Sequence, residues 1–250
     1  MRDFRDILTW DDKALSLDTM MTERDFSRAG FARLLDNPGL LAVPPGGIVP
    51  PEPVRFIVSC NGFSLYEWRF THTELKEPEQ LPETKKTSGG GRLTDMRLLR
   101  LSVPIPSGAG SRGKLLYDCV TGGDWDARLR WDALLTVISA MDAAVSAGMA
   151  GMTAPCGPLG IMVREDGSVL FLPVPLFPRL VASWGDDFSY TYLDIWTNLS
   201  RGMESGAVYT ASVCLYRMLT GFFPRDEKSN GYGDIVPLEI AAYNIDSAVA

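Results

Sequence analysis

The strongest constraint on the fold is a change of hydrophobic period at Asp126. Over residues 54–125, upstream of it, apolar residues alternate with polar ones in short runs, which is typical of half-buried strands. Downstream, apolar residues recur at helical spacing as far as Gly148, and the Asp126 carboxylate suits a helix N-cap. The apolar positions of this helix are Leu129, Trp131, Leu134, Leu135, Ile138, Met141 and Val145. Strands first and helices afterwards predict an α+β fold.

The first half of the chain divides into three expected segments. Residues 1–42 have apolar residues at helical spacing with charges between them, so we expect a helical N-terminal extension. Prolines and glycines over 43–53 predict a linker. Residues 54–125 predict a small sheet-rich lobe, in which Asn61-Gly62 marks a hairpin turn between two alternating runs. Further strands are expected at 96–106 and 114–120.

Two passages of the second half carry the most local information. The sequence GIMVREDGSVLFLP predicts a β-hairpin with its turn at Asp166-Gly167. The sequence AVYTASVCLYRMLTGFFP predicts a buried helix that ends at Gly221. The remainder is mostly helical in pattern, so we expect residues 126–250 to form a helical lobe.

These two passages, placed in this order after a long helix, resemble the large lobe of the protein kinase family. The hairpin resembles the two strands that follow the kinase catalytic loop, and the later helix resembles the pattern D-x-Y-S-L-G-x-x-L-Y-E-L-L-T-G-x-x-P. Its matching positions are Tyr209, Val213, Leu215, Tyr216, Leu219, Thr220, Gly221 and Pro224. The resemblance covers residues 126–225. It implies a protein kinase-like two-lobed domain with an antiparallel sheet N-lobe and a mainly helical C-lobe, truncated at its C-terminus.

The positions that carry chemistry in a kinase hold other residues in this register. The His-Arg-Asp positions fall on Thr153, Ala154 and Pro155, and the metal-binding Asn falls on Gly160. The Asp-Phe-Gly positions fall on Pro173, Val174 and Pro175. In a kinase the loop Asp accepts the proton of the substrate hydroxyl, while the Asn and the second Asp hold magnesium. Proline and glycine supply neither a base nor a side-chain metal ligand. We therefore expect no catalytic residue and no enzymatic activity.

Composition limits the partners and the compartment. The net charge of −7 argues against a nucleic-acid surface, which is normally basic. The chain shows no secretory signal and no apolar run long enough to cross a bilayer, so we expect a cytoplasmic protein, or the cytoplasmic part of a longer one. The four cysteines are far apart and predict reduced buried thiols rather than zinc ligands or disulfides. His72, the only histidine, is expected in an exposed loop, as is the run Gly89-Gly90-Gly91. No metal or cofactor site is predicted, and ATP binding without catalysis is left open.

Two functions of different classes remain compatible with the sequence. The first is a pseudokinase, a catalytically inactive kinase-like domain that acts as a protein-interaction or regulatory scaffold. Its expected partner surface is Tyr190, Tyr192, Trp196 and Leu199, whose alternative is packing onto the helical core.

The second function is an unorthodox nucleotide-dependent phosphotransferase with rebuilt metal ligands. The candidate ligands in the sequence are Asp118, Asp186 and Asp187. Asp186 and Asp187 are equally compatible with an exposed helix N-terminus, where carboxylates are favourable. A third interpretation is an unrelated α+β domain. The missing catalytic residues favour binding over chemistry.

Overall fold

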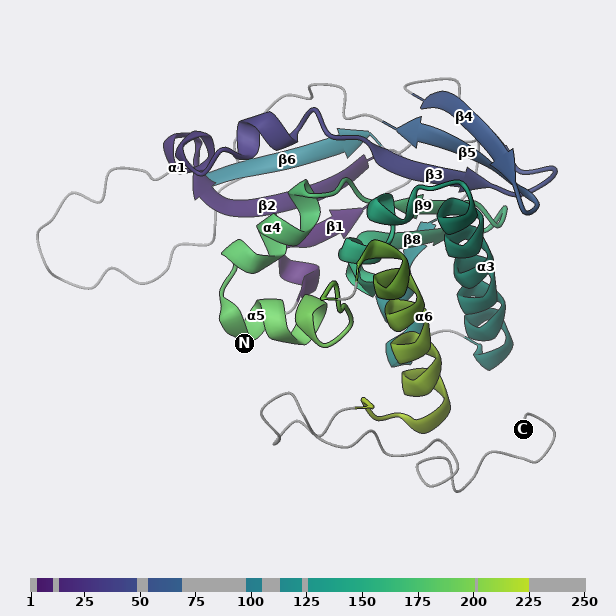
Figure 1. Ribbon diagram of the computed structural model, residues 1–250. Coiled ribbons are helices and arrows are strands. Elements are labelled where there is room, and N and C mark those ends of the chain that lie inside the picture. Colours follow the sequence, from purple (N-terminus) through teal and green to yellow (C-terminus); the bar gives the residue numbers. More distant parts are fainter. Residues whose placement is uncertain are drawn as a thin grey trace, which may run out of the picture.

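The computed structural model describes residues 4–10, 14–48, 54–68, 98–104, 113–122, 126–200 and 202–224 (Figure 1). Its strands are β1 (Leu8–Trp10), β2 (Ala14–Thr22), β3 (Gly39–Val43), β4 (Val54–Cys60), β5 (Phe63–Trp68), β6 (Leu98–Pro104), β7 (Gly113–Leu115), β8 (Ile161–Arg164) and β9 (Val169–Phe171). Its α-helices are α1 (Glu23–Arg28), α2 (Leu116–Thr121), α3 (Ala127–Ser146), α4 (Leu176–Ser183), α5 (Asp186–Ser189) and α6 (Met203–Thr220). The mixture of helices and antiparallel sheets makes the fold α+β, as the sequence predicts.

A six-stranded sheet organises the described residues. Its strand order is β4-β5-β3-β9-β8-β7, and every neighbouring pair is antiparallel. A smaller sheet has the order β1-β2-β6 and is also antiparallel. Because side chains alternate across a strand, the large sheet has two apolar faces, and each is covered by a different part of the chain.

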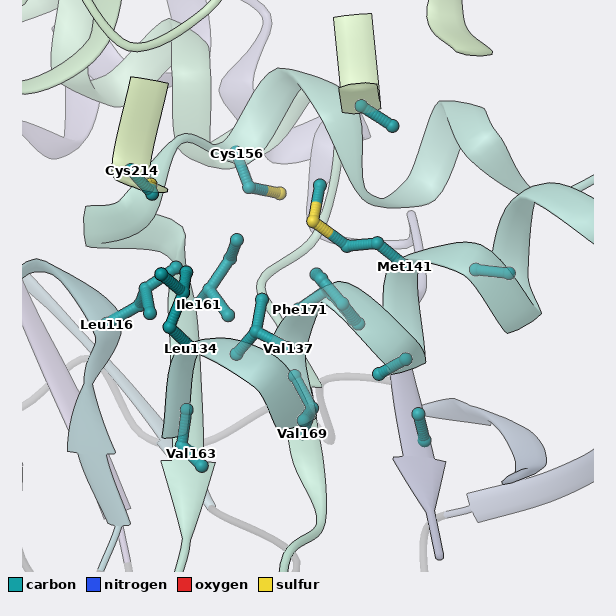
Figure 2. Close-up of a cluster of buried hydrophobic side chains, with 14 of the residues drawn as sticks. Leu116, Leu134, Val137, Met141, Cys156, Ile161, Val163, Val169, Phe171 and Cys214 are labelled. Carbon is teal, nitrogen blue, oxygen red and sulfur yellow. The ribbon is translucent and has the colours of Figure 1, made fainter. Parts of the chain in front are cut away.

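One face of the large sheet packs against helices. Leu40, Val163, Val169 and Phe171 from this face lie in one core cluster with residues of α2, α3 and α6. Figure 2 shows Val163, Val169 and Phe171 in this cluster, with Leu134, Val137 and Met141 coming from α3 and Cys214 from α6. The opposite face forms a second cluster with the small sheet, α4 and α5. The helices are thus the scaffold that holds the β8–β9 hairpin from one side.

Helix α3 and the β4–β5 hairpin form where the sequence predicts them. The Asp126 carboxylate accepts a hydrogen bond from the Arg128 backbone N–H at 2.8 Å, which confirms it as the N-cap. Asn61 and Gly62 both have positive φ, as the tight turn between β4 and β5 requires. The Asn61 side-chain amide also donates to the Asp142 carboxylate and to the Ser146 hydroxyl of α3.

The β8–β9 hairpin and helix α6 are also confirmed. The turn lies at Glu165–Gly167, where the Gly167 N–H donates to the Arg164 carbonyl and Gly167 has a φ of 77°. Helix α6 ends at Gly221, whose left-handed backbone lets its N–H donate to the Arg217 carbonyl. Both passages that resemble the kinase family therefore have the predicted secondary structure.

The prediction of a helical extension over residues 1–42 is wrong. The described residues of this part form β1, β2 and β3, and their helical elements are the short helix α1 and two 3-10 turns, one before β1 and one before β3. Leu15 and Leu17 of β2 are buried while Ser16 and Asp18 are more exposed, which is strand alternation. Strand β3 ends at Val43, and residues 49–53 of the expected linker lie outside the described part of the chain.

The strand predicted at 114–120 is mostly helix, because β7 ends at Leu115 and α2 begins at Leu116. The large sheet also differs from the arrangement that the kinase resemblance implies. A separate helical lobe requires the β8–β9 hairpin to stand apart from the N-terminal strands, whereas Ala42 of β3 pairs with Val169 of β9. A two-lobed arrangement is therefore not confirmed. Within the described residues, no helix combines the length and apolar character needed to span a membrane.

Candidate functional site

The segment between α3 and β8 is where the kinase resemblance locates catalysis, and it is closed to solvent. Residues 153–160 are all buried in two successive 3-10 turns beneath α6. The Thr153 hydroxyl donates to the Ala150 carbonyl at 3.0 Å, so it is occupied within its own turn. The Cys156 thiol donates to the Leu172 carbonyl at 3.0 Å. This segment is a packed connection with no carboxylate in it.

Gly160 leaves no room for a side chain. A Cβ added there would lie 2.7 Å from the Cβ of Cys156 and 2.9 Å from Cδ1 of Phe177. The Gly160 carbonyl accepts a hydrogen bond from the Leu172 N–H at 2.9 Å, which fixes the backbone at this point. Pro173 is buried next to this contact. Gly160 and Pro173, onto which the kinase resemblance places the metal-binding Asn and the second metal-binding Asp, therefore both lie in a closely packed region.

The three acidic residues considered as rebuilt metal ligands do not form a cluster. Asp118 lies in α2 and pairs with Arg5, the Oδ1 to Nη2 distance being 2.7 Å. Asp186 and Asp187 are exposed at the start of α5, as expected for an acidic helix start. Among the described residues, no group of three His, Cys, Asp or Glu side chains is arranged to hold a metal ion.

The expected partner surface is split between the core and the exterior. Trp196 is fully buried, its indole N–H donates to the Thr191 carbonyl at 3.0 Å, and its ring packs edge-on against Phe223. Tyr192 is 6 % exposed and its ring contacts Phe188. The prediction is therefore wrong for these two residues, which belong to the core.

Tyr190 and Leu199 are the two members of that set that face solvent. Tyr190 is 49 % exposed and Leu199 is 40 % exposed. In sequence they lie on either side of the buried pair, Tyr192 and Trp196. The chain from Tyr190 to Asp194 makes a π-helical turn, which directs Tyr190 outward and Tyr192 inward. Tyr190 and Tyr192 have the same hydropathy, so the sequence did not predict which of the two side chains faces solvent.

The thiols of the described chain are free, and three of the four are buried. Burial, and to a smaller extent the charge of Asp118, raises the pKa of the Cys119 thiol to about 12. Burial likewise raises the pKa of Cys156 and Cys214 far above the ordinary range. A nucleophilic or redox cysteine needs a lowered pKa and some exposure. These three residues therefore act as small apolar core residues.

Two hollows on the surface lie beside α3. The first, of about 370 Å³, lies between α3 and the β7–β8 edge, and its lining includes Lys114, Asp132, Thr136 and Glu165. Its charges are of both signs and give it no clear preference for an anion or a cation. The second, of about 330 Å³, runs between α3 and α6, and its lining is almost entirely apolar. Sequence analysis missed this groove, although the apolar positions of both helices span more than one face.

The buried guanidinium of Arg164 is a further feature that the sequence did not reveal. Arg164 is 4 % exposed, and burial lowers its pKa. Within the described residues, its Nη1 has no hydrogen-bond partner. In β8, Val163 pairs with Lys114 of β7, and Arg164 pairs with Gly113. Because successive side chains of a strand point to opposite faces, the Arg164 side chain points away from the face that α3 covers. Arg164 is also one of the residues that line the 370 Å³ hollow beside α3.

Comparisons with protein-family models, with curated proteins and with solved structures find no match for this chain.

Proposed function

We propose that this chain is a kinase-like domain without phosphoryl-transfer activity, and that it acts in the cytoplasm by binding another protein as a regulatory scaffold. The observation that carries the proposal is the burial of residues 153–160 between α3 and β8. A phosphotransferase needs a base next to an incoming hydroxyl and oxygen ligands for magnesium. This segment offers neither, and its interior packing excludes a substrate.

The order of elements supports the kinase-like part of the proposal. Helix α3, the buried turns, the β8–β9 hairpin and helix α6 follow one another as the resemblance implies. Helix α6 packs directly on the turn Ala154–Cys156, which is the contact expected between this helix and the former catalytic loop. Ala207 of α6 is buried there, at the position where the family's Asp would anchor the loop. A loop without catalytic residues has no need of that anchor.

Exposed apolar side chains support the binding part of the proposal. Tyr190, Leu199 and Met203 are between 40 % and 49 % exposed, and all lie in the segment from the end of α5 to the start of α6. Exposed apolar and aromatic residues are a feature of protein-interaction surfaces. The free thiols of the described chain suit a reducing compartment.

Thermal unfolding of the full chain with ATP tests the catalytic part. A ligand at a hundred times its dissociation constant stabilises a protein by about 2.7 kcal/mol, which shifts the midpoint measurably. We expect no shift with millimolar ATP and Mg²⁺ or Mn²⁺, and no phosphoryl transfer to protein or water. A metal-dependent shift accompanied by transfer would contradict the proposal. It would instead favour the phosphotransferase, and Asp186→Asn and Asp187→Asn would be the next variants.

Site-specific photo-crosslinking in cells tests the binding part. A photoreactive amino acid replaces Tyr190, and in a separate chain it replaces Leu135, which is 53 % exposed on α3 and serves as the matched control. We expect one discrete protein adduct from position 190 and none of the same mass from position 135. Equal adduct patterns at the two positions would mean that the surface around Tyr190 has no specific partner.

A further inference from the structure

The closed end of the β8–β9 hairpin carries two polar side chains on one face of the large sheet. Arg164 and Ser168 lie opposite each other there, and the Arg164 N–H donates to the Ser168 carbonyl at 2.9 Å. One step further into the hairpin, Val163 pairs with Val169. Because opposite residues of an antiparallel pair point to the same face, the Cβ atoms of Arg164 and Ser168 are expected to lie about 4.5–5.5 Å apart.

Both side chains are buried, and both hold a polar atom without a partner. Arg164 is 4 % exposed and Ser168 is fully buried. Within the described part of the chain, Nη1 of Arg164 and Oγ of Ser168 have no hydrogen-bond partner. Buried polar groups in proteins are nearly always hydrogen bonded. Two exceptions that are neighbours on one face therefore point to a ligand that contacts both.

The acidic neighbour, Asp166, is already engaged in the hairpin turn. Its Oδ1 accepts a hydrogen bond from the Ser168 N–H at 2.9 Å, and its Oδ2 accepts one from the Ile48 N–H at 3.3 Å. The charge of Asp166 raises the pKa of Arg164, but burial has the larger effect and lowers this pKa. Asp166 therefore compensates for only part of the cost of burying the guanidinium.

The charge of Arg164 indicates what kind of ligand is needed. A guanidinium stays protonated in proteins, and burying an unpaired charge costs far more than burying a neutral polar group. An ordered water can serve the Ser168 hydroxyl, but it brings no negative charge to Arg164. A planar fork of N–H donors beside a hydroxyl donor matches the oxygens of a carboxylate or a phosphate.

The surroundings limit the size of the ligand. Arg164, Glu165 and Gly167 are among the residues that line the 370 Å³ hollow, so open space adjoins this end of the hairpin. The guanidinium itself has little exposed surface, because the whole residue is only 4 % exposed. Such a site suits one phosphate or carboxylate group rather than the row of phosphates in a nucleotide.

We propose that Arg164 and Ser168 form a binding site for a single oxyanion group, a phosphate or a carboxylate, at the closed end of the β8–β9 hairpin. Arg164 supplies the positive charge and the Nη1 donor, and Ser168 supplies its hydroxyl. The bound anion neutralises the buried charge and so stabilises the hairpin and the strands beside it. The site does not depend on the kinase-like function, because it is formed by the hairpin alone.

Thermal unfolding of the full chain tests the site with inorganic phosphate and, separately, with acetate. Chloride keeps the ionic strength constant. We expect one of these anions, at millimolar concentration, to raise the unfolding midpoint by at least about 2 °C, and the effective anion identifies the ligand class. Arg164→Gln should remove this shift. Arg128→Gln removes the same charge from an exposed position on α3 and should keep the shift.

Three results of this experiment would overturn the proposal. The first is no shift of the unaltered chain with either anion. The second is an equal shift in the unaltered chain and in Arg164→Gln, which would mean that the anion acts on the protein surface in general. The third is a loss of stability in Arg164→Gln that is the same with and without the anions. That result would assign the guanidinium to a carboxylate of the chain itself.

Isothermal titration measures the site without relying on the stability of one variant. The unaltered chain should bind one phosphate or one acetate ion. Arg164→Lys keeps the charge but lacks the planar fork, so its affinity should fall about tenfold and stay measurable. Ser168→Ala removes one hydrogen bond, and we expect affinity to fall about threefold to tenfold. Affinities unchanged in both variants would overturn the proposal.

Discussion

Gly160 and Cys156 are in such close contact that a Cβ on Gly160 would lie 2.7 Å from the Cβ of Cys156. Nearly all real Cβ atoms keep a larger separation, so the neighbouring backbone or the Phe177 ring would have to move. Gly160→Asn, which would place the metal-binding residue of the kinase pattern at this position, should therefore destabilise the fold. Overpacking of a tight core costs about 1–3 kcal/mol, and we expect urea denaturation to show a loss in this range or above.

The control for this substitution is Gly46→Asn. Gly46 has open space around its Cα and a φ of 82°, a backbone region that asparagine tolerates better than most residues. We expect its unfolding free energy to stay within about 0.5–1 kcal/mol of the unaltered protein. If Gly160→Asn lowered the unfolding free energy no more than Gly46→Asn does, residues 153–160 would have to be less tightly packed than the structure indicates.

The Asn61–Asp142 hydrogen bond should hold the β4–β5 turn against α3. Asn61→Gly keeps the left-handed backbone of the turn but removes the amide that donates to Asp142 and to Ser146. We expect a loss of about 1–3 kcal/mol in unfolding free energy, the usual net contribution of two hydrogen bonds. A double-mutant cycle with Asp142→Ala isolates the pair. Full additivity in that cycle would mean that the two side chains do not interact in solution.

The elements that the sequence predicted correctly are those with strong local signals. Helix α3 combines a long apolar period with the Asp126 cap, and the β8–β9 hairpin has an Asp-Gly turn. The β4–β5 hairpin has Asn61-Gly62. In each of these, the side-chain pattern and the residues at the turn or cap favour the same secondary structure. The tertiary contacts favour it too, so the local prediction is correct.

The incorrect predictions fall where local signals were short or ambiguous. Residues 14–22 contain Leu15 and Leu17 at strand spacing, but the surrounding charges also allow a helical reading. Leu115 and Leu116 lie side by side in a short apolar run, and periodicity alone does not separate strand from helix there. Trp196 and Tyr190 have similar apolar character, and their burial depends on the π-helical turn and on contacts with distant residues such as Phe223.

Thiol labelling should separate Cys60 from the other cysteines. Cys60 is partly exposed at the end of β4, whereas Cys119, Cys156 and Cys214 are buried. At pH 8 in native conditions, we expect one thiol to react quickly with an aromatic disulfide reagent and the other three to react only when urea unfolds the chain. Cys60→Ser should abolish the fast phase. A fast phase that persists in this variant would place another thiol near the surface.

Stability should fall in alkaline solution because of the buried thiols. The pKa of Cys119 rises from its ordinary 9.0 to about 12 in the folded protein, chiefly because the thiol is buried. Below pH 9 both the folded and unfolded chains hold this proton, so the free energy of unfolding is unaffected. Between pH 9 and pH 12 the unfolded chain releases the proton while the folded chain keeps it. The unfolded state is thereby favoured as the pH rises.

Cys119→Ala isolates this effect from other groups that titrate in the same range. Well above pH 9, the free energy of unfolding of the unaltered protein should fall faster than that of Cys119→Ala, by an amount approaching about 1.4 kcal/mol per pH unit. Urea denaturation at pH 8, 9.5 and 10.5 measures the difference. Parallel curves for the two proteins would show that Cys119 ionises as readily in the folded chain as in the unfolded one.

Alanine substitution of Trp196 and of Tyr190 should show a large difference in unfolding free energy, because one side chain lies in the core and the other on the surface near α5. Trp196 is fully buried and its indole N–H is hydrogen bonded, so Trp196→Ala should cost about 3–5 kcal/mol, the usual range for a large buried aromatic residue. Tyr190 is 49 % exposed, and Tyr190→Ala should cost less than about 1 kcal/mol. Thermal and urea unfolding of both variants measure the contrast. A large loss for Tyr190→Ala would place Tyr190 in the folding core and remove it from the proposed partner surface, whereas a small loss leaves it available to a partner without any change in the fold.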